Sequence, residues 1–129
     1  RIATAWAGNA DVRFRAATGG VLTALGMYLL TSGQARFILH CGADTRRPMR
    51  SRWFFSDTPE EVLARAGSRY GPSDKLAGLE VTLAREEPFA IIAKPCDAGA
   101  VRAREKRPAH KVTPYDAPRD GVWRRVRSW

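Results

Sequence analysis

Leucines recur along residues 18–33 at spacings of three and four, which is the period of an α-helix with one apolar face. The residues that form or widen this stripe are Val21, Leu22, Leu25, Leu29 and Leu30. Gly33 stands beyond the last of them, where a glycine commonly ends a helix. The pattern therefore predicts an amphipathic helix from Thr18 to about Gly33.

Short apolar runs elsewhere have the length of strands. The continuous runs at Ala35–Cys41 and Phe89–Lys94 are typical of strands that are covered on both faces. A shorter run predicts a strand at Arg52–Phe55, and Ile2–Ala7 predicts an edge strand at the beginning of the chain.

A helix-start signal follows the second of these strands. Thr58 is a hydroxyl N-cap, Pro59 suits the first helical position, and Glu61 is placed to complete a capping box. These residues predict a helix that runs to about Ala66 and stops at Gly67.

Two further helices complete the pattern. Leu76, Leu79 and Leu83 would share one face of a helix over residues 72–83, and the alanines after Asp97 favour a short helix. Helices that alternate with buried strands indicate the α/β class, here a small sheet of buried strands with flanking helices.

The character of the chain changes after about Arg102, where apolar residues thin out and prolines break the periodicity. These prolines are Pro108, Pro114 and Pro118. We expect residues 1–102 to form one domain, incomplete as it stands. We expect residues 103–129 to be an irregular, basic, proline-containing tail that is disordered or out of frame.

The net charge of +9 favours a nucleic-acid partner only if the basic residues cluster on the folded domain. Residues 1–100 contain 13 basic and 10 acidic side chains, a net charge of +3, whereas residues 101–129 contain 9 and 3, a net charge of +6. The excess belongs to the tail, so nucleic-acid binding by the domain is disfavoured.

Targeting signals and cysteine spacing narrow the class of protein further. The longest apolar run, Val21–Leu30, is shorter than the roughly 20 residues of a membrane span, and no basic-then-apolar leader is visible, so we expect a cytoplasmic protein. Cys41 and Cys96 lie far apart without CxxC spacing, so this chain alone offers neither a zinc site nor a complete iron-sulfur site.

The first candidate site is Thr18-Gly19-Gly20 at the beginning of the long helix, with Arg13 and Arg15 just upstream. Free backbone N–H groups, the helix dipole and glycines that permit close approach together favour an anion. The alternative is a plain N-cap followed by two loop glycines.

The second candidate lies between two predicted helices, in residues 67–72. Gly67 is explained as a helix cap and Gly71 as part of a turn, which leaves Arg69 and Tyr70. An arginine can hold a phosphate with two hydrogen bonds, and a tyrosine face can pack on a planar ring.

The third candidate is Lys94-Pro95-Cys96-Asp97 after a buried strand, where open α/β sheets usually bind ligands. Lys94 and a helix N-terminus would favour the Cys96 thiolate, although a buried and inert cysteine is the alternative. His40, at another strand end, is interpreted as a polar residue with an internal partner rather than a ligand or base.

Four strings, taken in order and spacing, resemble the coenzyme F(420) hydrogenase/dehydrogenase beta subunit family. They are RFRAATGGVLTAL (13–25), YLLTSG (28–33), AGSRYGP (66–72) and PFAIIAKPCD (88–97). The resemblance implies an FAD-dependent α/β oxidoreductase subunit that passes electrons between iron-sulfur clusters and an organic acceptor, such as a deazaflavin coenzyme or a tetrapyrrole. It implies hydride transfer at the flavin, and an electron-donor or acceptor subunit or a ferredoxin as partner.

The resemblance also implies roles for individual residues. Lys94 and Cys96 would be catalytic, beside the flavin ring, and Cys96 would be a cluster ligand or neighbour. The residues implied to bind the cofactor are Arg13, Thr18, Gly19, Gly20, Thr23, Ser68, Arg69, Tyr70, Lys94 and Pro95.

The chain also departs from the family pattern, because the additional cysteines and the second domain that members usually carry are missing from it. We therefore expect iron-sulfur clusters in members of the family, but we do not expect this chain to assemble one by itself. Two alternatives stay open: a basic module that contacts nucleic acid or an acidic partner through its tail, and a truncated fragment that is inactive alone.

Overall fold

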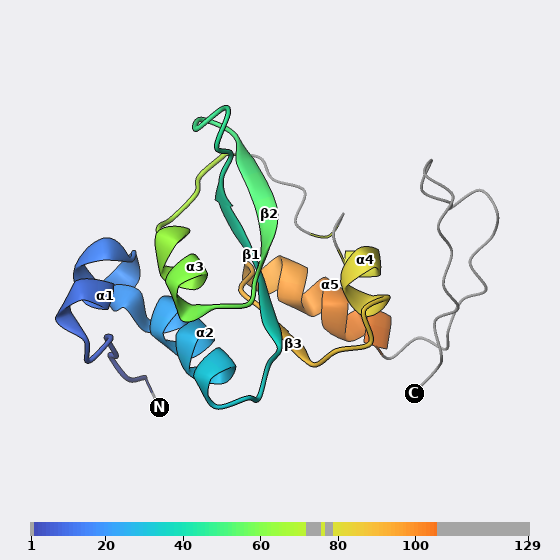
Figure 1. Cartoon of the computed structure of the whole chain (residues 1–129), viewed down its shortest axis with the longest axis horizontal. Coiled ribbons are helices and arrows are strands. Elements are labelled where there is room, and N and C mark those ends of the chain that lie inside the picture. The colour runs from blue at the N-terminus through green and yellow to red at the C-terminus, as the bar shows by residue number, and fades with distance from the viewer. Residues whose placement is uncertain (1, 72–75, 77–78, 106–129) are drawn as a thin grey trace.

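A computed structural model describes residues 2–71, 76 and 79–105, along which helices and strands alternate (Figure 1). The three strands form one small sheet, and helices lie on both sides of it. In chain order the elements are α1 (Ala10–Arg15), the 3-10 turn η1 (Thr18–Gly20), α2 (Val21–Thr31), β1 (Phe37–Ala43), β2 (Ser51–Ser56), α3 (Pro59–Ala64), α4 (Leu79–Leu83), β3 (Phe89–Ile91) and α5 (Pro95–Glu105).

The sheet has the order β2-β1-β3, with β1 at its centre. Strand β2 runs antiparallel to β1, with Phe55 opposite Leu39, and β3 runs parallel to β1, with Ile91 opposite Leu39. This mixed sheet with flanking helices confirms the α/β class. It also confirms the strands predicted at 35–41, 52–55 and 89–94, with their ends moved by one to three residues.

Side chains of β1 alternate between the two faces of the sheet. On one face Ile38 is fully buried with Val62 of α3, and residues of α2 pack against this core. On the other face Phe37 stacks on Phe89 with ring centroids 5.4 Å apart. Arg85, just after α4, covers this face with its guanidinium 4.2 Å from the Phe37 ring. Each face of β1 is therefore covered by a different part of the chain.

Only the second half of the leucine stripe of α2 faces the core, where Leu29 and Leu30 are half-buried and pack against it. Leu22 and Leu25 are 59% and 49% exposed, whereas Thr23 and Gly26 are buried. Gly26 has no side chain, which lets α2 come close to the sheet: a Cβ there would lie 3.3 Å from Ile92 Cδ1. Over its first half the helix is therefore buried on small residues, which a search for apolar side chains does not detect.

The beginning of the chain also differs from the prediction, because residues 2–7 form no strand. Ile2 is fully exposed, and the N–H of Ala7 donates to the carbonyl oxygen of Gly19 at 2.7 Å rather than to a strand. Helix α1 follows, capped by the Asn9 side chain, which accepts the N–H groups of Asp11 and Val12. This short helix was not predicted, although Asn9 is a standard N-cap residue.

Helix α3 begins as predicted. The Thr58 hydroxyl accepts the N–H of Glu61 at 3.3 Å, and the Glu61 carboxylate accepts the N–H of Asp57 at the same distance. The helix ends at Ala64, two residues before the predicted end.

The later elements are only partly comparable with the prediction. Half of the helix expected at 72–83 lies outside the described residues, and its described part includes α4, with Leu79 buried. Helix α5 begins at Pro95, two residues earlier than expected, and continues to Glu105, past the expected domain boundary at Arg102. The remainder of the expected tail, residues 106–129, lies outside the described part of the chain.

Candidate functional site

Two of the three sequence motifs lie at the same end of the sheet. Helix α2 is joined to β1 by only residues 32–36, and it runs in the opposite direction to β1 (Figure 1). Because β3 is parallel to β1, the beginning of α2 and the end of β3 share the end of the sheet where β1 and β3 finish, here called the carboxyl end. The turn Thr18–Gly20 and the segment Lys94–Cys96 therefore both belong to the carboxyl end, where α/β sheets usually bind ligands.

The turn before α2 has an uncommon backbone. Thr18, Gly19 and Gly20 have φ angles of 53°, 68° and 75°, a left-handed conformation that favours glycine. A Cβ on Gly19 would lie 3.2 Å from Trp6 Cβ, and one on Gly20 would lie 3.0 Å from the carbonyl oxygen of Val12. Contacts within the chain therefore account for both glycines, whatever the turn binds.

The N-terminus of α2 carries no side-chain cap, because Gly20 occupies the N-cap position. The first N–H groups of a helix have no acceptor inside the helix, and the helix dipole adds partial positive charge there. Thr23, also a predicted contact, is buried in the first turn of the helix. The geometry suits an anion that accepts hydrogen bonds from the backbone.

Arg13 has a structural partner. Its Nη1 donates to the carbonyl oxygen of Ala7 at 3.0 Å, and the N–H of Ala7 in turn donates to Gly19. Arg13 thus holds the residues before α1 against the turn. The sequence did not indicate this role, because the acceptor is a backbone carbonyl.

Ser68, Arg69 and Tyr70 follow α3, and only Arg69 is held in place by described contacts. Its guanidinium donates to the carbonyl oxygens of Pro48 and Arg50 at 2.5 and 3.2 Å, and its Nε lies 3.4 Å from Ser51 Oγ. Ser68 is exposed, and Tyr70 is 96% exposed. Arg69 fastens the loop between β1 and β2, so phosphate binding would have to compete with these bonds.

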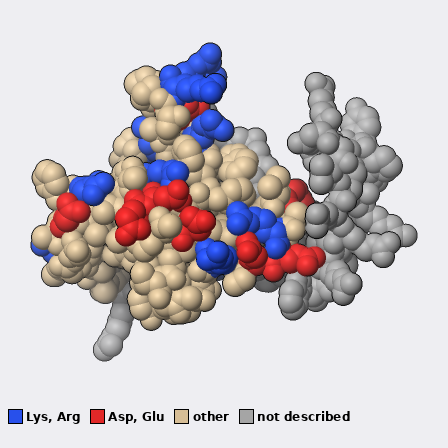
Figure 2. All heavy atoms as spheres, in the orientation of Figure 1, with Lys and Arg blue, Asp and Glu red and all other residues tan. Residues whose placement is uncertain are grey.

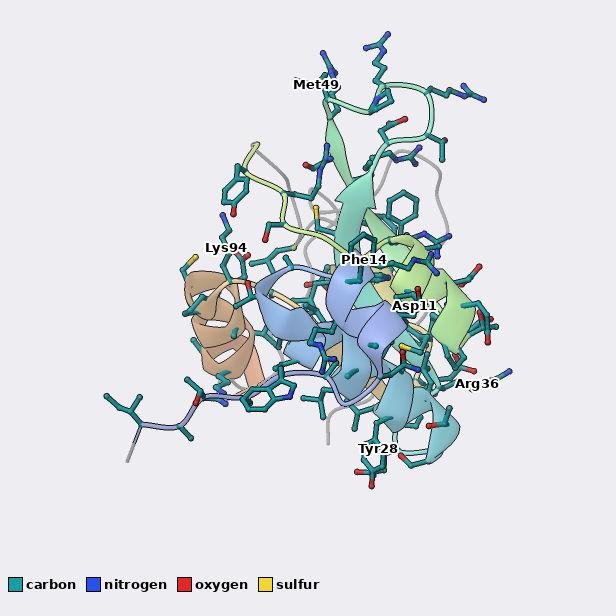
Figure 3. All side chains as sticks on the ribbon, turned by 90° about the vertical axis from the view of Figure 1, so that its left-hand side faces the viewer. Asp11, Phe14, Tyr28, Arg36, Met49 and Lys94 are labelled. Carbon is teal, nitrogen blue, oxygen red and sulfur yellow. The ribbon has the colours of Figure 1, made fainter. Side chains whose placement is uncertain are left out.

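Lys94, Pro95 and Cys96 are exposed where α5 begins, and Figure 3 labels Lys94 there. Cys96 Sγ lies 3.9 Å from Asp97 Oδ1, and Cys96 and Cys41 are both free thiols. The segment is reachable from solvent, as a cofactor or redox contact requires.

The donor atoms of this chain do not fit an iron-sulfur cluster held by it alone. Clusters are usually held by four cysteine thiolates, and this sequence has two cysteines. Within residues 2–71, 76 and 79–105, no three His, Cys, Asp or Glu side chains gather as a metal site would need.

A buried polar chain crosses the face of the sheet beneath α3. His40 Nε2 lies 2.7 Å from Ser56 Oγ, which accepts a hydrogen bond from Arg65 Nη1 at 2.8 Å. Burial, together with the nearby Arg65 guanidinium, lowers the pKa of His40 to about 4, against the opposing effect of Glu61. Ser56 is fully buried, so this pair is structural, and the interpretation of His40 as an internally satisfied residue is confirmed.

A cavity of about 290 Å³ opens at the other end of the sheet, away from the sequence motifs. Its lining residues are Leu30, Gly33, Ala35, Arg36, Asp57, Glu87 and Pro88. None of them is a predicted site residue. We place the candidate site at the carboxyl end because the uncapped helix N-terminus and exposed Lys94 lie there. Groups that can bind an anionic cofactor are stronger evidence for a site than the volume of a cavity.

The fold and this end of the sheet define an α/β protein with a candidate anion-binding helix N-terminus. Residues 2–80, more than half of the chain, match the family described as "Coenzyme F(420) hydrogenase/dehydrogenase, beta subunit N-term". The chain belongs to this family, as its four sequence strings predict.

A solved structure has the same fold. It is a chain of the F(420)-reducing NiFe hydrogenase complex from Methanosarcina barkeri, with 24% identity and a TM-score of 0.70. The match covers 78% of this chain and 35% of that chain, so this chain spans about a third of its neighbour's length. At this identity the likeness concerns the fold.

A search of curated proteins found no match to the chain. Within its described residues, no helix has the length and apolar content to pass through a bilayer.

Proposed function

We propose that this chain is the FAD-binding, N-terminal part of an oxidoreductase subunit that transfers electrons between redox partners. Membership of the beta subunit family supports the class of activity, and the uncapped N-terminus of α2 supports the site. That helix end is the observation that carries the proposal, because it offers unpaired N–H groups where a diphosphate would need them.

The proposal gives the residues of the carboxyl end distinct tasks. The turn Thr18–Gly20 fixes the direction of α2, and the first N–H groups of α2 bind the phosphates. Exposed Lys94 places a positive charge beside the flavin ring, where it favours the reduced, anionic form. FAD, when bound, supplies the hydride and single-electron chemistry.

Two of the predicted roles need groups from outside this chain. Cys96 can ligate a cluster only if further thiolates come from outside these 129 residues, and we propose a partner subunit or a ferredoxin as the carrier of the clusters. The organic acceptor is proposed to be a planar heterocycle, such as a deazaflavin or a tetrapyrrole, that reaches the flavin at this end of the sheet. Ser68 and Tyr70, both exposed, are proposed contacts there.

The test uses Leu22, which is 59% exposed in the first turn of α2. Leu22→Asp places a carboxylate where the phosphates should lie, while an acid at this position favours the helix itself. Leu22→Asn is the matched neutral control. We expect Leu22→Asp to bind FAD about tenfold more weakly than Leu22→Asn, which corresponds to roughly 1.4 kcal/mol.

Binding is measured by quenching of flavin fluorescence and by the rise in melting temperature at about 50 µM FAD. Riboflavin has the flavin ring but no phosphates, so it tests binding of the ring alone. Both variants should bind riboflavin with the same affinity. Equal FAD affinity of the two variants would place the phosphates elsewhere. A wild-type chain that neither quenches FAD nor gains stability from it would refute FAD binding by this chain.

A further inference from the structure

The loop between β1 and β2 projects from the body of the molecule and is strongly basic. It contains Arg46, Arg47 and Arg50, with Arg52 at the beginning of β2 and a single acid, Asp44. Figure 2 shows these positive side chains gathered at the protruding tip. We call residues 44–50 the basic hairpin tip.

Hydrogen bonds hold the backbone of the basic hairpin tip in one conformation. Asp44 Oδ1 accepts the N–H groups of Arg46 and Arg47 at 2.8 and 3.2 Å. The N–H of Asp44 donates to the carbonyl oxygen of Arg50 at 2.9 Å. The Arg69 guanidinium donates to this same carbonyl oxygen and to that of Pro48. A loop ordered in advance loses less conformational entropy when it binds a partner.

These bonds do not use the side chains of Arg46, Arg47 and Arg50. All three residues are exposed, and their guanidiniums make no hydrogen bond or ion pair within the described part of the chain. The Asp44 carboxylate accepts hydrogen bonds from the loop backbone and forms an ion pair with Arg52, whose Nε lies 3.8 Å from Asp44 Oδ2. The N–H of Arg46, with the N–H of Arg47 and the nearby charges of the Arg52 and Arg46 side chains, lowers the pKa of Asp44, so this acid stays ionised in its internal role.

Met49 gives the basic hairpin tip an apolar centre. It is 92% exposed, and Figure 3 shows it at the tip among the basic side chains. Arginine and methionine are enriched in protein interfaces, whereas lysine is depleted, and the tip has three arginines and no lysine. Residues 44–50 also include no aromatic side chain on which a nucleic-acid base could stack. The composition favours a protein surface over a nucleic acid.

We propose that the basic hairpin tip docks onto an acidic surface of a partner protein. Arg46, Arg47 and Arg50 pair with carboxylates there, and Met49 enters an apolar spot between them. The bidentate geometry of arginine suits carboxylates, and the ordered loop fixes the spacing of the three guanidiniums. None of the four docking side chains is a proposed flavin contact, so the docking surface is tested without FAD.

The test compares two triple variants of the full chain that remove the same charge. Arg46→Gln/Arg47→Gln/Arg50→Gln alters the tip, and Arg15→Gln/Arg36→Gln/Arg102→Gln removes exposed arginines elsewhere. The probe is a fluorescein-labelled glutamate-rich peptide of about ten residues with a leucine at its centre, titrated at about 50 mM salt. A thymidine oligonucleotide of similar charge is the second probe. Circular dichroism checks that each variant is folded.

We expect the tip variant to bind the peptide at least about fivefold more weakly than wild type, and the control variant less than about twofold more weakly. Met49→Ser should weaken binding of the leucine-containing peptide more than that of an all-glutamate peptide. Equal losses in the two triple variants would overturn the proposal, because net charge alone would then explain binding. A tip-dependent loss for the oligonucleotide that exceeds the loss for the peptide would identify a nucleic-acid surface instead.

Discussion

His40 shows how one side chain can couple folding to pH. Its ring is 6% exposed and faces Ser56, which already accepts a hydrogen bond from the cationic Arg65. A proton on His40 would place a second positive charge near Arg65 with little solvent to screen it. The pKa of His40 in the folded protein is therefore lowered to about 4, and the ring is neutral above that pH.

The consequence is a loss of stability as the pH falls. His40 takes up a proton near pH 6.5 in the unfolded chain and near pH 4 in the folded one, so its contribution is complete above pH 6.5 and decreases below it. We expect the free energy of unfolding, from urea titrations, to be lower by about 2 kcal/mol at about pH 5 than at about pH 7.5.

His40→Gln keeps a polar partner for Ser56 and has no such proton, so its stability should change little over the same interval. If wild type and His40→Gln respond equally to pH, other groups are responsible. An NMR titration of the His40 ring in the folded protein measures its pKa directly.

Arg69 illustrates what the sequence could not reveal at the scale of a residue. An arginine between two glycines fits a phosphate ligand, yet its guanidinium binds the carbonyl oxygens of Pro48 and Arg50. These acceptors are backbone atoms about twenty residues earlier, and every residue type has such a carbonyl. No pattern of side chains can therefore indicate this contact. The same holds for Arg13 and the carbonyl of Ala7.

Elements were predictable where their signal was local. The capping residues Thr58 and Glu61 fix the beginning of α3, and the continuous apolar runs fix the strands. Helix α2 was found, but only the second half of its buried face was, because the first half is built on Thr23 and Gly26 rather than on leucines. Which face of a helix is buried depends on the shape of its neighbour, and Ile38, Val62 and Ile92 come from three other parts of the chain.

A pair of glycines tests how the beginning and end of α2 are built. Gly20 and Gly33 have similar φ angles of 75° and 70°, but a Cβ on Gly20 would lie 3.0 Å from a backbone oxygen, whereas one on Gly33 would meet nothing within 4 Å. We expect Gly33→Ala to cost about 1 kcal/mol of unfolding free energy, from its backbone conformation alone. Gly20→Ala should cost about 1–3 kcal/mol more, because the backbone must also move.

Urea denaturation of the two variants measures this difference. Equal costs would mean that Ala7 and Val12 move aside at little cost in free energy when a Cβ is added at Gly20. The turn Thr18–Gly20 would then be too flexible to determine the orientation of α2.

At the scale of the molecule, the candidate site joins segments that are distant in sequence. The turn Thr18–Gly20 and the segment Lys94–Cys96 meet the same end of the sheet only because β3 inserts parallel to β1. The sequence indicated each segment, and the family resemblance linked them, but the parallel pairing of β3 comes from the fold. In this register Phe37 lies opposite Phe89 and the two rings stack, a pairing that neither apolar run reveals alone.

Hydrogen exchange with and without FAD tests whether these segments act as one site. Bound ligand slows exchange where it orders or covers the backbone, so FAD should protect residues 18–23 and 92–97 together, by about tenfold at saturating flavin. Residues 33–36, at the opposite end of the sheet beside the cavity, serve as the internal control and should be unchanged.

The pattern of protection separates three arrangements. Protection of residues 18–23 alone would confine the ligand to the α2 N-terminus and remove Lys94 from the flavin. Protection centred on residues 33–36 would move the ligand to the cavity lined by Arg36 and Asp57, against the proposed site. Joint protection of the first two segments requires a ligand long enough to span them, as FAD is with phosphates at one end and a ring at the other.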